Sequence, residues 1–327
     1  MNTKGAEEAM RASTKAGAIP SRRRLTSPQR EGYVLFALAL PFLALVFLFS
    51  YLPLWGWRYA LYDYLPGFKL ENCEFVGLKW FQFLVSNKTQ VDEILRVLRN
   101  TFAISGLNLL TSVLPIAFAV LLNELRSDRM KRVVQTLTTL PHFIGWVLIY
   151  SMAYAIFSYN TGVFNKALLA LNVLDTPVNW LASGEHIWLK MCAWSVWKNI
   201  GWNAIMYLAA MAGIDQELYE AATVDGAGRF RKIWHITIPG LMPTFFVLLM
   251  MAVANFLNSG MEQYYVFQNA LNQKSIEVLD LYVYNIGIGN GTIPLATVVS
   301  MLKSIVSLTL LFIVNGLSKL TRGETII

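Results

Sequence analysis

Residues 217–243 read ELYEAATVDGAGRFRKIWHITIPGLMP, and this polar stretch separates two apolar runs that are each near the length needed to cross a membrane. Gly226 and Gly228 stand at its centre and permit a sharp turn through positive φ. The stretch therefore predicts two short helices joined by a glycine turn. We call this compact helical segment, residues 213–240, the knuckle.

Both predicted helices of the knuckle have recognisable ends. Asp215 is a candidate N-cap, and acidic Glu217 follows in the first turn, where the helix dipole favours negative charge. Apolar residues recur at helical spacing on the second helix, at Phe230, Ile233 and Trp234. We expect Pro239 and Pro243 to end this helix and to reorient the chain into the next apolar run. Small side chains leave room for another protein to approach closely, at Ala221, Ala222 and Ala227.

The whole chain has the composition of an integral membrane protein. Of its 327 residues, 55% are hydrophobic and only 14% are charged, whereas soluble domains carry about 25% charged residues. A helix needs roughly 20 apolar residues to cross the hydrocarbon core. Six runs are near that length, at residues 33–54, 101–122, 133–157, 187–212, 241–257 and 295–317. The predicted fold class is therefore an all-α integral membrane protein with six transmembrane helices.

The six runs divide the chain into a membrane domain and two tails. Residues 1–32 are a polar, basic tail, residues 33–317 form the membrane domain, and residues 318–327 form a second tail. The loop at residues 51–99 is rich in aromatic residues near its start, as expected at a membrane interface, and should fold over the outer mouth. Apolar residues at helical spacing predict a lead-in helix to the second span, at Ile94, Leu95, Leu98 and Phe102.

Lysine and arginine predict the orientation, because cytoplasmic flanks retain positive charge during insertion. Of the 27 lysines and arginines, sixteen lie in the tails, the knuckle and the loop between spans two and three, eight lie in the other loops, and three lie within spans. Both termini and the knuckle should therefore be cytoplasmic. This bias accounts for much of the net charge of +7 without a nucleic-acid partner. Cys73 and Cys192 are too few for a disulfide framework.

Eight residues of the knuckle follow an ordered pattern, namely Glu220, Ala221, Ala222, Asp225, Gly226, Ala227, Ile236 and Pro239. The pattern resembles the coupling loop of permeases from binding-protein-dependent ABC importers, in which Glu-Ala-Ala precedes Asp-Gly-Ala and then Ile and Pro. Outside the knuckle, four segments are similar to permeases of complex-carbohydrate importers, among them the larger permease subunit of the alginate importer. These segments are Arg99–Thr101, Leu122–Leu125, Leu140–Phe143 and Asp280–Tyr284.

This resemblance implies that the knuckle docks into a groove of a cytoplasmic ATPase subunit and transmits its nucleotide-driven closure. ATPase coupling is then assigned to the eight residues above, together with Glu217 and Phe230. The expected partners are a second related permease, two ATPase subunits that bind ATP and Mg, an extracytoplasmic solute-binding protein, an oligosaccharide and membrane lipid. The expected location is the bacterial cytoplasmic (inner) membrane, and no cofactor is expected in this chain.

Other classes of protein fit the sequence less well. The chain contains no Gly-Lys dipeptide and so has no Walker-type phosphate loop, which leaves ATP hydrolysis to a partner. An ion-driven secondary transporter is the main alternative, although it would normally show repeated halves, and no such symmetry is visible. Neither a His-Glu-x-x-His nor a Gly-x-Ser-x-Gly motif occurs, which argues against an intramembrane enzyme. The three histidines fall in different regions, so no metal site is expected.

Polar and aromatic residues on three spans are candidates for a substrate pathway. They are Trp194, Trp197, Lys198 and Asn199 on span four, Asn255, Asn258, Glu262 and Tyr264 on or after span five, and Lys303 on span six. Helical spacing places Lys190, Trp194, Trp197, Lys198 and Gly201 along one face, and it aligns Asn255, Asn258 and Glu262. Amides suit sugar hydroxyls and aromatic rings suit sugar faces. Such stripes also join helices to one another, and this alternative is equally open.

Two lysines bear on the substrate. Lys198 and Lys303 are costly to bury unless they meet water, an acidic partner or an anionic ligand. An acidic oligosaccharide, such as one built from uronic acids, would satisfy them, and the similarity to the alginate importer points the same way. The alternative is a neutral oligosaccharide, with the lysines paired to Glu262 or to helix carbonyls.

Overall fold

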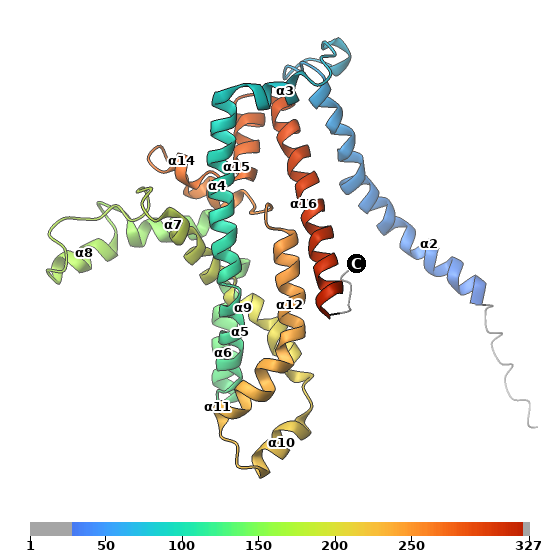
Figure 1. Ribbon diagram of the computed structural model, residues 1–327. Coiled ribbons are helices and arrows are strands. Elements are labelled where there is room, and N and C mark those ends of the chain that lie inside the picture. Colours follow the sequence, from blue (N-terminus) through green and yellow to red (C-terminus); the bar gives the residue numbers. More distant parts are fainter. Residues whose placement is uncertain (1–27, 323–327) are drawn as a thin grey trace, which may run out of the picture. The chain divides into compact units, whose positions relative to one another are not determined.

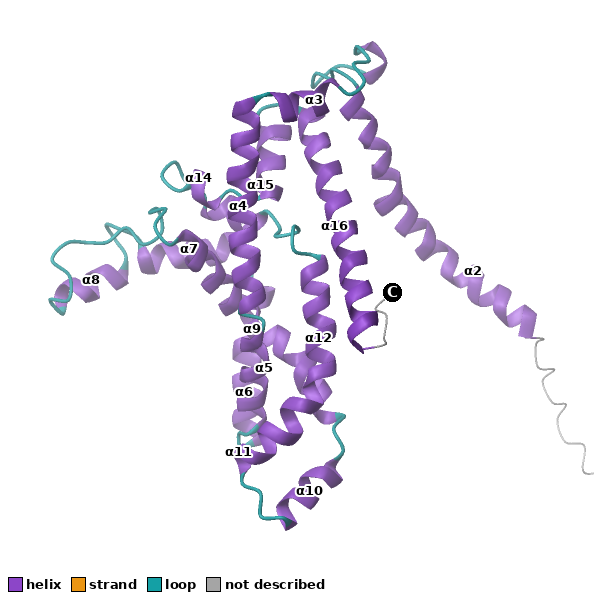
Figure 2. Cartoon of the chain, viewed as in Figure 1, coloured by secondary structure: helices purple, strands orange, loops and turns teal. Residues whose placement is uncertain are grey.

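A computed structural model describes residues 28–322, and nearly all of this range is helix or turn (Figures 1 and 2). Within the described range, the one β-type pairing is an isolated antiparallel bridge between Tyr62 and Phe75. The chain forms two compact units, residues 1–56 and residues 57–327, which are described separately. The all-helical fold class predicted from composition is thus confirmed.

The described part of the first unit consists of α2 (Pro28–Val46), π-helical η1 (Phe47–Tyr51) and the start of the 3₁₀ helix η2 (Leu52–Leu61). Its large apolar side chains are exposed along the helix. The apolar stretch Val34–Leu61 is long enough to cross a membrane, so this surface suits lipid. Helix α2 already includes residues assigned above to the basic tail, and residues 1–27 of that tail lie outside the described residues.

The segment after η2 leads into the second predicted span. Lys79, at the start of α3 (Lys79–Ser86), donates a 2.8 Å hydrogen bond to Asp63, and this bond raises the pKa of Lys79. Helix α4 (Lys88–Leu110) is capped by Asn87, whose side chain accepts a hydrogen bond from the Gln90 amide. This helix confirms the predicted lead-in helix and is followed directly by α5 (Val113–Asn123).

The third predicted span is broken rather than straight. Helix α6 (Asp128–Thr139) and the short η4 (Leu140–Phe143) meet α7 (Trp146–Phe157) at an angle of 107°. Pro141 has no N–H to donate, and both Ile144 and Gly145 adopt extended backbone angles, so the helical hydrogen bonds cannot continue through the bend. We call residues 140–145 the elbow. The expectation of one uninterrupted helix over residues 133–157 was wrong.

The knuckle follows the long helix α9 (Ile187–Ala212). It contains α10 (Gln216–Val224) and then α11 (Arg229–Lys232), π-helical η5 (Ile233–Thr237) and the start of α12 (Ile238–Ala254). The expectation that Pro239 and Pro243 end the second helix was wrong, because residues 229–254 run as one helix. Pro239 stands at the start of α12, just after the π-helical turn has changed the hydrogen-bond register, and Pro243 is accommodated inside α12.

The remaining elements complete the second unit. They are η3 (Leu70–Asn72), α8 (Val163–Ala170), α13 (Glu262–Phe267), α14 (Gln273–Ile276), α15 (Leu279–Tyr284), η6 (Asn285–Gly289) and α16 (Ile293–Arg322). Helix α16 passes the predicted end of span six at residue 317, and residues 323–327 lie outside the described residues.

Helix α9 lies at the centre of the packing in the second unit. Its first half joins a cluster with Tyr264 and Phe267 of α13, and its second half packs on α5 and α12 through Ala204, Tyr207 and Met211. Four helical stretches of the described residues are long and apolar enough to span a membrane, or five if the two arms of the elbow form one span. Helix α9 coincides with predicted span four but is not among them, so the count of six stays a prediction.

Candidate functional site

The turn of the knuckle is a helix-terminating motif that explains the spacing of its residues. Gly226 has a φ of +72°, and its N–H donates to the Thr223 carbonyl at 3.1 Å. The Ala227 N–H donates to the Ala222 carbonyl at 2.8 Å. These two bonds define a Schellman motif, in which glycine takes the left-handed position that follows the C-cap residue, here Asp225. Gly228, in contrast, is extended with a φ of −71°, so the prediction of positive φ was right for Gly226 and wrong for Gly228.

Side-chain hydrogen bonds hold the two helices of the knuckle together. At the start of α10 the Asp215 carboxylate accepts from the Glu217 N–H at 3.0 Å, as the N-cap prediction required. Further along, the Tyr219 hydroxyl and the Thr237 hydroxyl lie 2.9 Å apart, and Lys232 Nζ donates to Thr223 Oγ1 at 2.6 Å. Helix α10 is therefore fixed against the start of the long helix behind it.

The outer surface of the knuckle is apolar where a soluble loop would be polar. Val224 and Phe230 are each 89% exposed, and Leu218 and Trp234 are also largely exposed. The predicted coupling residues divide into an exposed set, Glu217, Glu220, Ala221, Asp225, Gly226, Phe230 and Pro239, and a half-buried set, Ala222, Ala227 and Ile236. Exposed apolar side chains rimmed by charged groups are typical of a protein-docking surface.

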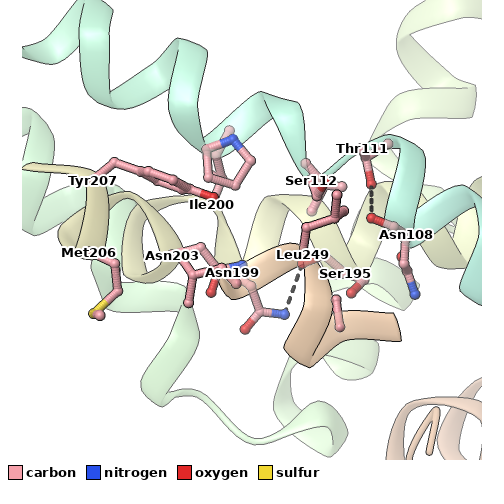
Figure 3. A pocket seen from close by; sticks show the side chains of 14 residues that line it. Asn108, Thr111, Ser112, Ser195, Asn199, Ile200, Asn203, Met206, Tyr207 and Leu249 are labelled. Carbon is pink, nitrogen blue, oxygen red and sulfur yellow. Dashed lines mark hydrogen bonds between the residues drawn. The ribbon is translucent and has the colours of Figure 1, made fainter. Parts of the chain in front are cut away.

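A polar cavity of about 370 Å³ lies between the junction of α4 with α5, one face of α9, and α12 (Figure 3). The junction contributes Asn108, Thr111 and Ser112, while α9 contributes a polar row, Ser195, Asn199, Asn203 and Tyr207. Apolar residues of α12 close the third side, Leu248, Leu249 and Ala252. Among the described residues that line it, none is charged. Hydroxyl and amide groups of this kind both donate and accept hydrogen bonds, as a sugar requires.

Of the predicted pathway residues, only Asn199 lines this polar cavity. Its side chain donates to the Ser195 carbonyl at 3.0 Å, and its Oδ1 lies 2.9 Å from Nδ1 of His142 in the elbow. Sequence reasoning missed the rest of the polar row. The signal was present, since Ser195, Asn199, Asn203 and Tyr207 recur at intervals of four residues and therefore share one helical face.

Trp194 and Trp197 line a different, aromatic cavity of about 480 Å³ on another side of α9. Trp194 packs against Phe267 and stands edge-on to Trp197, with ring centroids 5.8 and 5.7 Å apart. Lys190 lies at the same cavity and donates to the Ser183 carbonyl at 3.2 Å. The two tryptophans and Asn199 therefore belong to separate cavities.

Lys198 is held by the backbone of the elbow rather than by an acid. Its Nζ donates to the carbonyls of Pro141 at 3.2 Å and His142 at 2.9 Å, and also to that of Ile144. An ammonium group has three donors, and here three carbonyls of the elbow accept them; that of Pro141 also accepts the Ile144 N–H at 3.2 Å, whereas Lys198 is the donor for those of His142 and Ile144. The ring of Trp146 lies 5.3 Å from the same Nζ. Glu262 is exposed and makes no ion pair with Lys198.

The other predicted pathway residues lie elsewhere. Lys303 pairs with Asp280, so neither lysine is left needing an anionic ligand, and this part of the argument for an acidic substrate is removed. Asn255 and Asn258 stand in the turn after α12, joined by a 3.3 Å side-chain hydrogen bond, and thus are not aligned with Glu262 on one helix. Helix α12 ends at Ala254, and residues 255–257 form the turn that follows it. Tyr264 is buried in the core.

Comparison with known proteins identifies the class to which this architecture belongs. A family described as the binding-protein-dependent transport system inner membrane component matches residues 111–322, which include the knuckle and every lining residue of the polar cavity except Asn108. The chain belongs to this family. It is therefore a permease component of a transport system, as its resemblance to the family predicted.

Two curated relatives from Bacillus subtilis (strain 168) match this permease over most of its length. Protein LplB is 38% identical over 87% of this chain and 88% of its own. The polygalacturonan/rhamnogalacturonan transport system permease protein YteP is 35% identical over 91% of each chain. The trehalose/maltose transport system permease protein MalF of Thermococcus litoralis is 29% identical over 68% of this permease and 72% of its own chain. Two of these three relatives are thus named for the transport of sugars or polysaccharides.

Solved structures show the same fold. A bacterial ABC transporter involved in the import of the acidic polysaccharide alginate aligns with a TM-score of 0.79 and 29% identity, over 90% of this permease and 97% of that chain. A bacterial alginate ABC transporter in complex with an alginate pentasaccharide-bound periplasmic protein aligns with a TM-score of 0.80 and 29% identity. That alignment covers 93% of this permease and 100% of the other chain.

Proposed function

We propose that this permease forms half of the membrane channel of an ATP-driven importer for oligosaccharides in the bacterial cytoplasmic membrane. In this proposal both termini and the knuckle are cytoplasmic. A second related permease forms the other half, two ATPase subunits bind ATP and Mg, and an extracytoplasmic solute-binding protein delivers the sugar. The chain itself moves substrate and performs no hydrolysis.

The knuckle is the observation that carries this proposal. It presents a short helix with a fixed end, held to a long helix by side-chain hydrogen bonds, and its exposed apolar residues Val224 and Phe230 have no partner of their own in the described chain. An ATPase subunit that received these side chains would bury them. Its movement would then pass directly into the helix that begins at Arg229.

We infer that the substrate is an acidic oligosaccharide containing uronic acids. The support comes from relatives, since YteP is named for polygalacturonan and rhamnogalacturonan transport and the two solved structures for alginate. The polar cavity supports recognition of hydroxyl groups, which acidic and neutral sugars share. Its uncharged lining favours a neutral oligosaccharide as the second candidate, in agreement with the trehalose/maltose relative.

The test uses the complete importer reconstituted in lipid, with its binding protein loaded with either oligogalacturonate or maltotriose. We expect sugar-loaded binding protein to stimulate ATP hydrolysis and uptake, and oligogalacturonate to be the better substrate of the two. Equal stimulation by maltotriose would refute the acidic assignment but leave the importer intact. Uptake driven by an ion gradient, in vesicles without ATPase subunits, would refute the importer and favour a secondary transporter.

A further inference from the structure

A second polar pocket, of about 430 Å³, lies beside the knuckle rather than in the channel region. Its walls come from the end of α5, from α6 and from the first turns of α10, while apolar residues of α9 form its floor. The polar lining consists of Asn123, Glu124, Lys131, Gln135, Gln216 and Tyr219. Its volume is within the range of about 300–1,000 Å³ typical of small-molecule sites.

Several polar groups of this pocket have no partner in the protein. The side chains of Glu124 and Gln135 are half-buried, yet neither makes a hydrogen bond or an ion pair with any residue in the range 28–322. Lys131 uses one of its three donors, on Asn123 Oδ1 at 2.7 Å. Half-buried polar side chains that line a pocket and have no partner in the protein are free to pair with a ligand that enters it.

The position of Glu124 sharpens the chemistry of that ligand. Glu124 is the C-cap of α5, where the exposed carbonyls already create a negative potential. A carboxylate in this place gains most from a ligand that offers several hydrogen-bond donors. The neighbouring ammonium group of Lys131 and the amide of Gln135 require acceptors as well. A carbohydrate offers both kinds of contact. Its hydroxyl groups donate and accept hydrogen bonds at the polar walls, and its ring faces pack on the apolar floor.

We propose that this pocket is a cytoplasmic product site, at which imported oligosaccharide binds and slows further transport. Two of its lining residues, Gln216 and Tyr219, belong to α10. The Tyr219 hydroxyl also joins α10 to η5 through its hydrogen bond with Thr237. A sugar that bridges these residues to Glu124 and Gln135 restrains the knuckle against α5 and α6. Because the ATPase subunits act through the knuckle, restraint there lowers the rate of the whole cycle. The inference rests on the proposed function and names a regulation of it.

The experiment uses proteoliposomes of the complete importer in which the ATPase faces outward, with loaded binding protein and sugar inside. Trigalacturonate is then added outside, at the ATPase face, and the rate of ATP hydrolysis is measured. We expect inhibition that rises with its concentration. Glu124→Gln and Gln135→Ala should each raise the half-inhibitory concentration by roughly ten-fold, because each variant loses about one hydrogen bond to the sugar. Both should keep the uninhibited rate. Glu185→Gln, at an exposed carboxylate outside the pocket, is the matched control.

Three results overturn the proposal, and each differs from failure of the importer itself. Normal uptake without inhibition by external trigalacturonate shows that the pocket binds no product. Inhibition that is unchanged in both variants places the inhibitory site elsewhere. Loss of ATPase subunits from the purified Glu124→Gln complex, with inhibition unaltered, shows that a basic side chain of the ATPase occupies the pocket instead. If no sugar is taken up under any condition, the proposed function has failed and this inference fails with it.

Discussion

Replacing Gly226 by valine would test whether the shape of the knuckle, rather than its charge, couples the permease to its ATPase. Gly226 holds a φ of +72°, and a Cβ built on it meets no atom within 4 Å. The substitution therefore removes no contact and creates no clash with neighbouring residues. What it changes is the backbone preference of this one residue, since a β-branched side chain disfavours the left-handed region.

The size of the effect follows from the turn. Placing an L-residue in the left-handed conformation costs about 1–2 kcal/mol, and a β-branched residue lies at the upper end. If the turn opens, the hydrogen bonds from Gly226 to Thr223 and from Ala227 to Ala222 are also lost. A cost of about 2 kcal/mol lowers the population of the docking-competent turn by up to roughly 30-fold. The apparent affinity for the ATPase subunits should fall by the same factor.

The assay measures ATPase subunits retained by the purified permease, and ATP hydrolysis stimulated by loaded binding protein. Gly228→Val is the matched control, because Gly228 has an extended backbone and equally open surroundings. Gly226→Asn should restore much of the loss, since asparagine tolerates the left-handed region. Equal behaviour of Gly226→Val and Gly228→Val, with both proteins inserted normally, would refute the reasoning.

Three further predictions concern the membrane region. Lys198→Met leaves the elbow carbonyls of His142 and Ile144 without a donor, at about 1–3 kcal/mol each, while that of Pro141 keeps the Ile144 N–H. The amount of folded protein and the transport rate should therefore fall, while the ratio of acidic to neutral sugar transport stays the same. Lys190→Met, which frees one carbonyl, is the milder control, and a changed ratio would place Lys198 in contact with substrate. Gly201→Ala places a Cβ 2.3 Å from the carbonyl oxygen of Thr138 in α6, so the free energy of unfolding should drop by about 1–3 kcal/mol and the melting temperature should fall. An unchanged melting temperature would contradict the close approach of α6 to α9. In a cysteine-free background, an impermeant thiol reagent should label position 274 but not position 229 in intact cells, and the reverse pattern would invert the topology.

The knuckle was predictable from sequence because its structure is local. The Asp215 cap bonds to the Glu217 amide, and the glycine turn is closed by hydrogen bonds between residues 222 and 227, so each feature joins residues at most five positions apart. The family pattern can be recognised for the same reason. The prolines were misjudged because a π-helical turn, Ile233–Thr237, let the helix continue, and nothing in the local pattern distinguishes that turn from an ordinary end.

The elbow and the polar cavity depend on contacts between distant segments. Pro141 and Gly145 were visible in the sequence, yet an apolar run around them favoured a straight span. The partners of Lys198 are carbonyls more than 50 residues away, and a backbone carbonyl leaves no mark in a sequence. One wall of the cavity, the row that contains Asn199, could have been predicted from its spacing. The facing wall at Asn108 could not, because only the folded chain brings α4 beside α9.

The continuous helix over residues 229–254 has a mechanical consequence. At 1.5 Å per residue its 26 residues form a rod of roughly 39 Å, with Phe230 at one end and cavity residues Leu248 and Ala252 near the other. A flexible loop between these ends would absorb a displacement before it reached the sugar. A helical rod does not, so a tilt imposed at the knuckle moves the cavity wall at the same moment. The π-helical turn and Pro243 are the places along the rod where such a lever can bend.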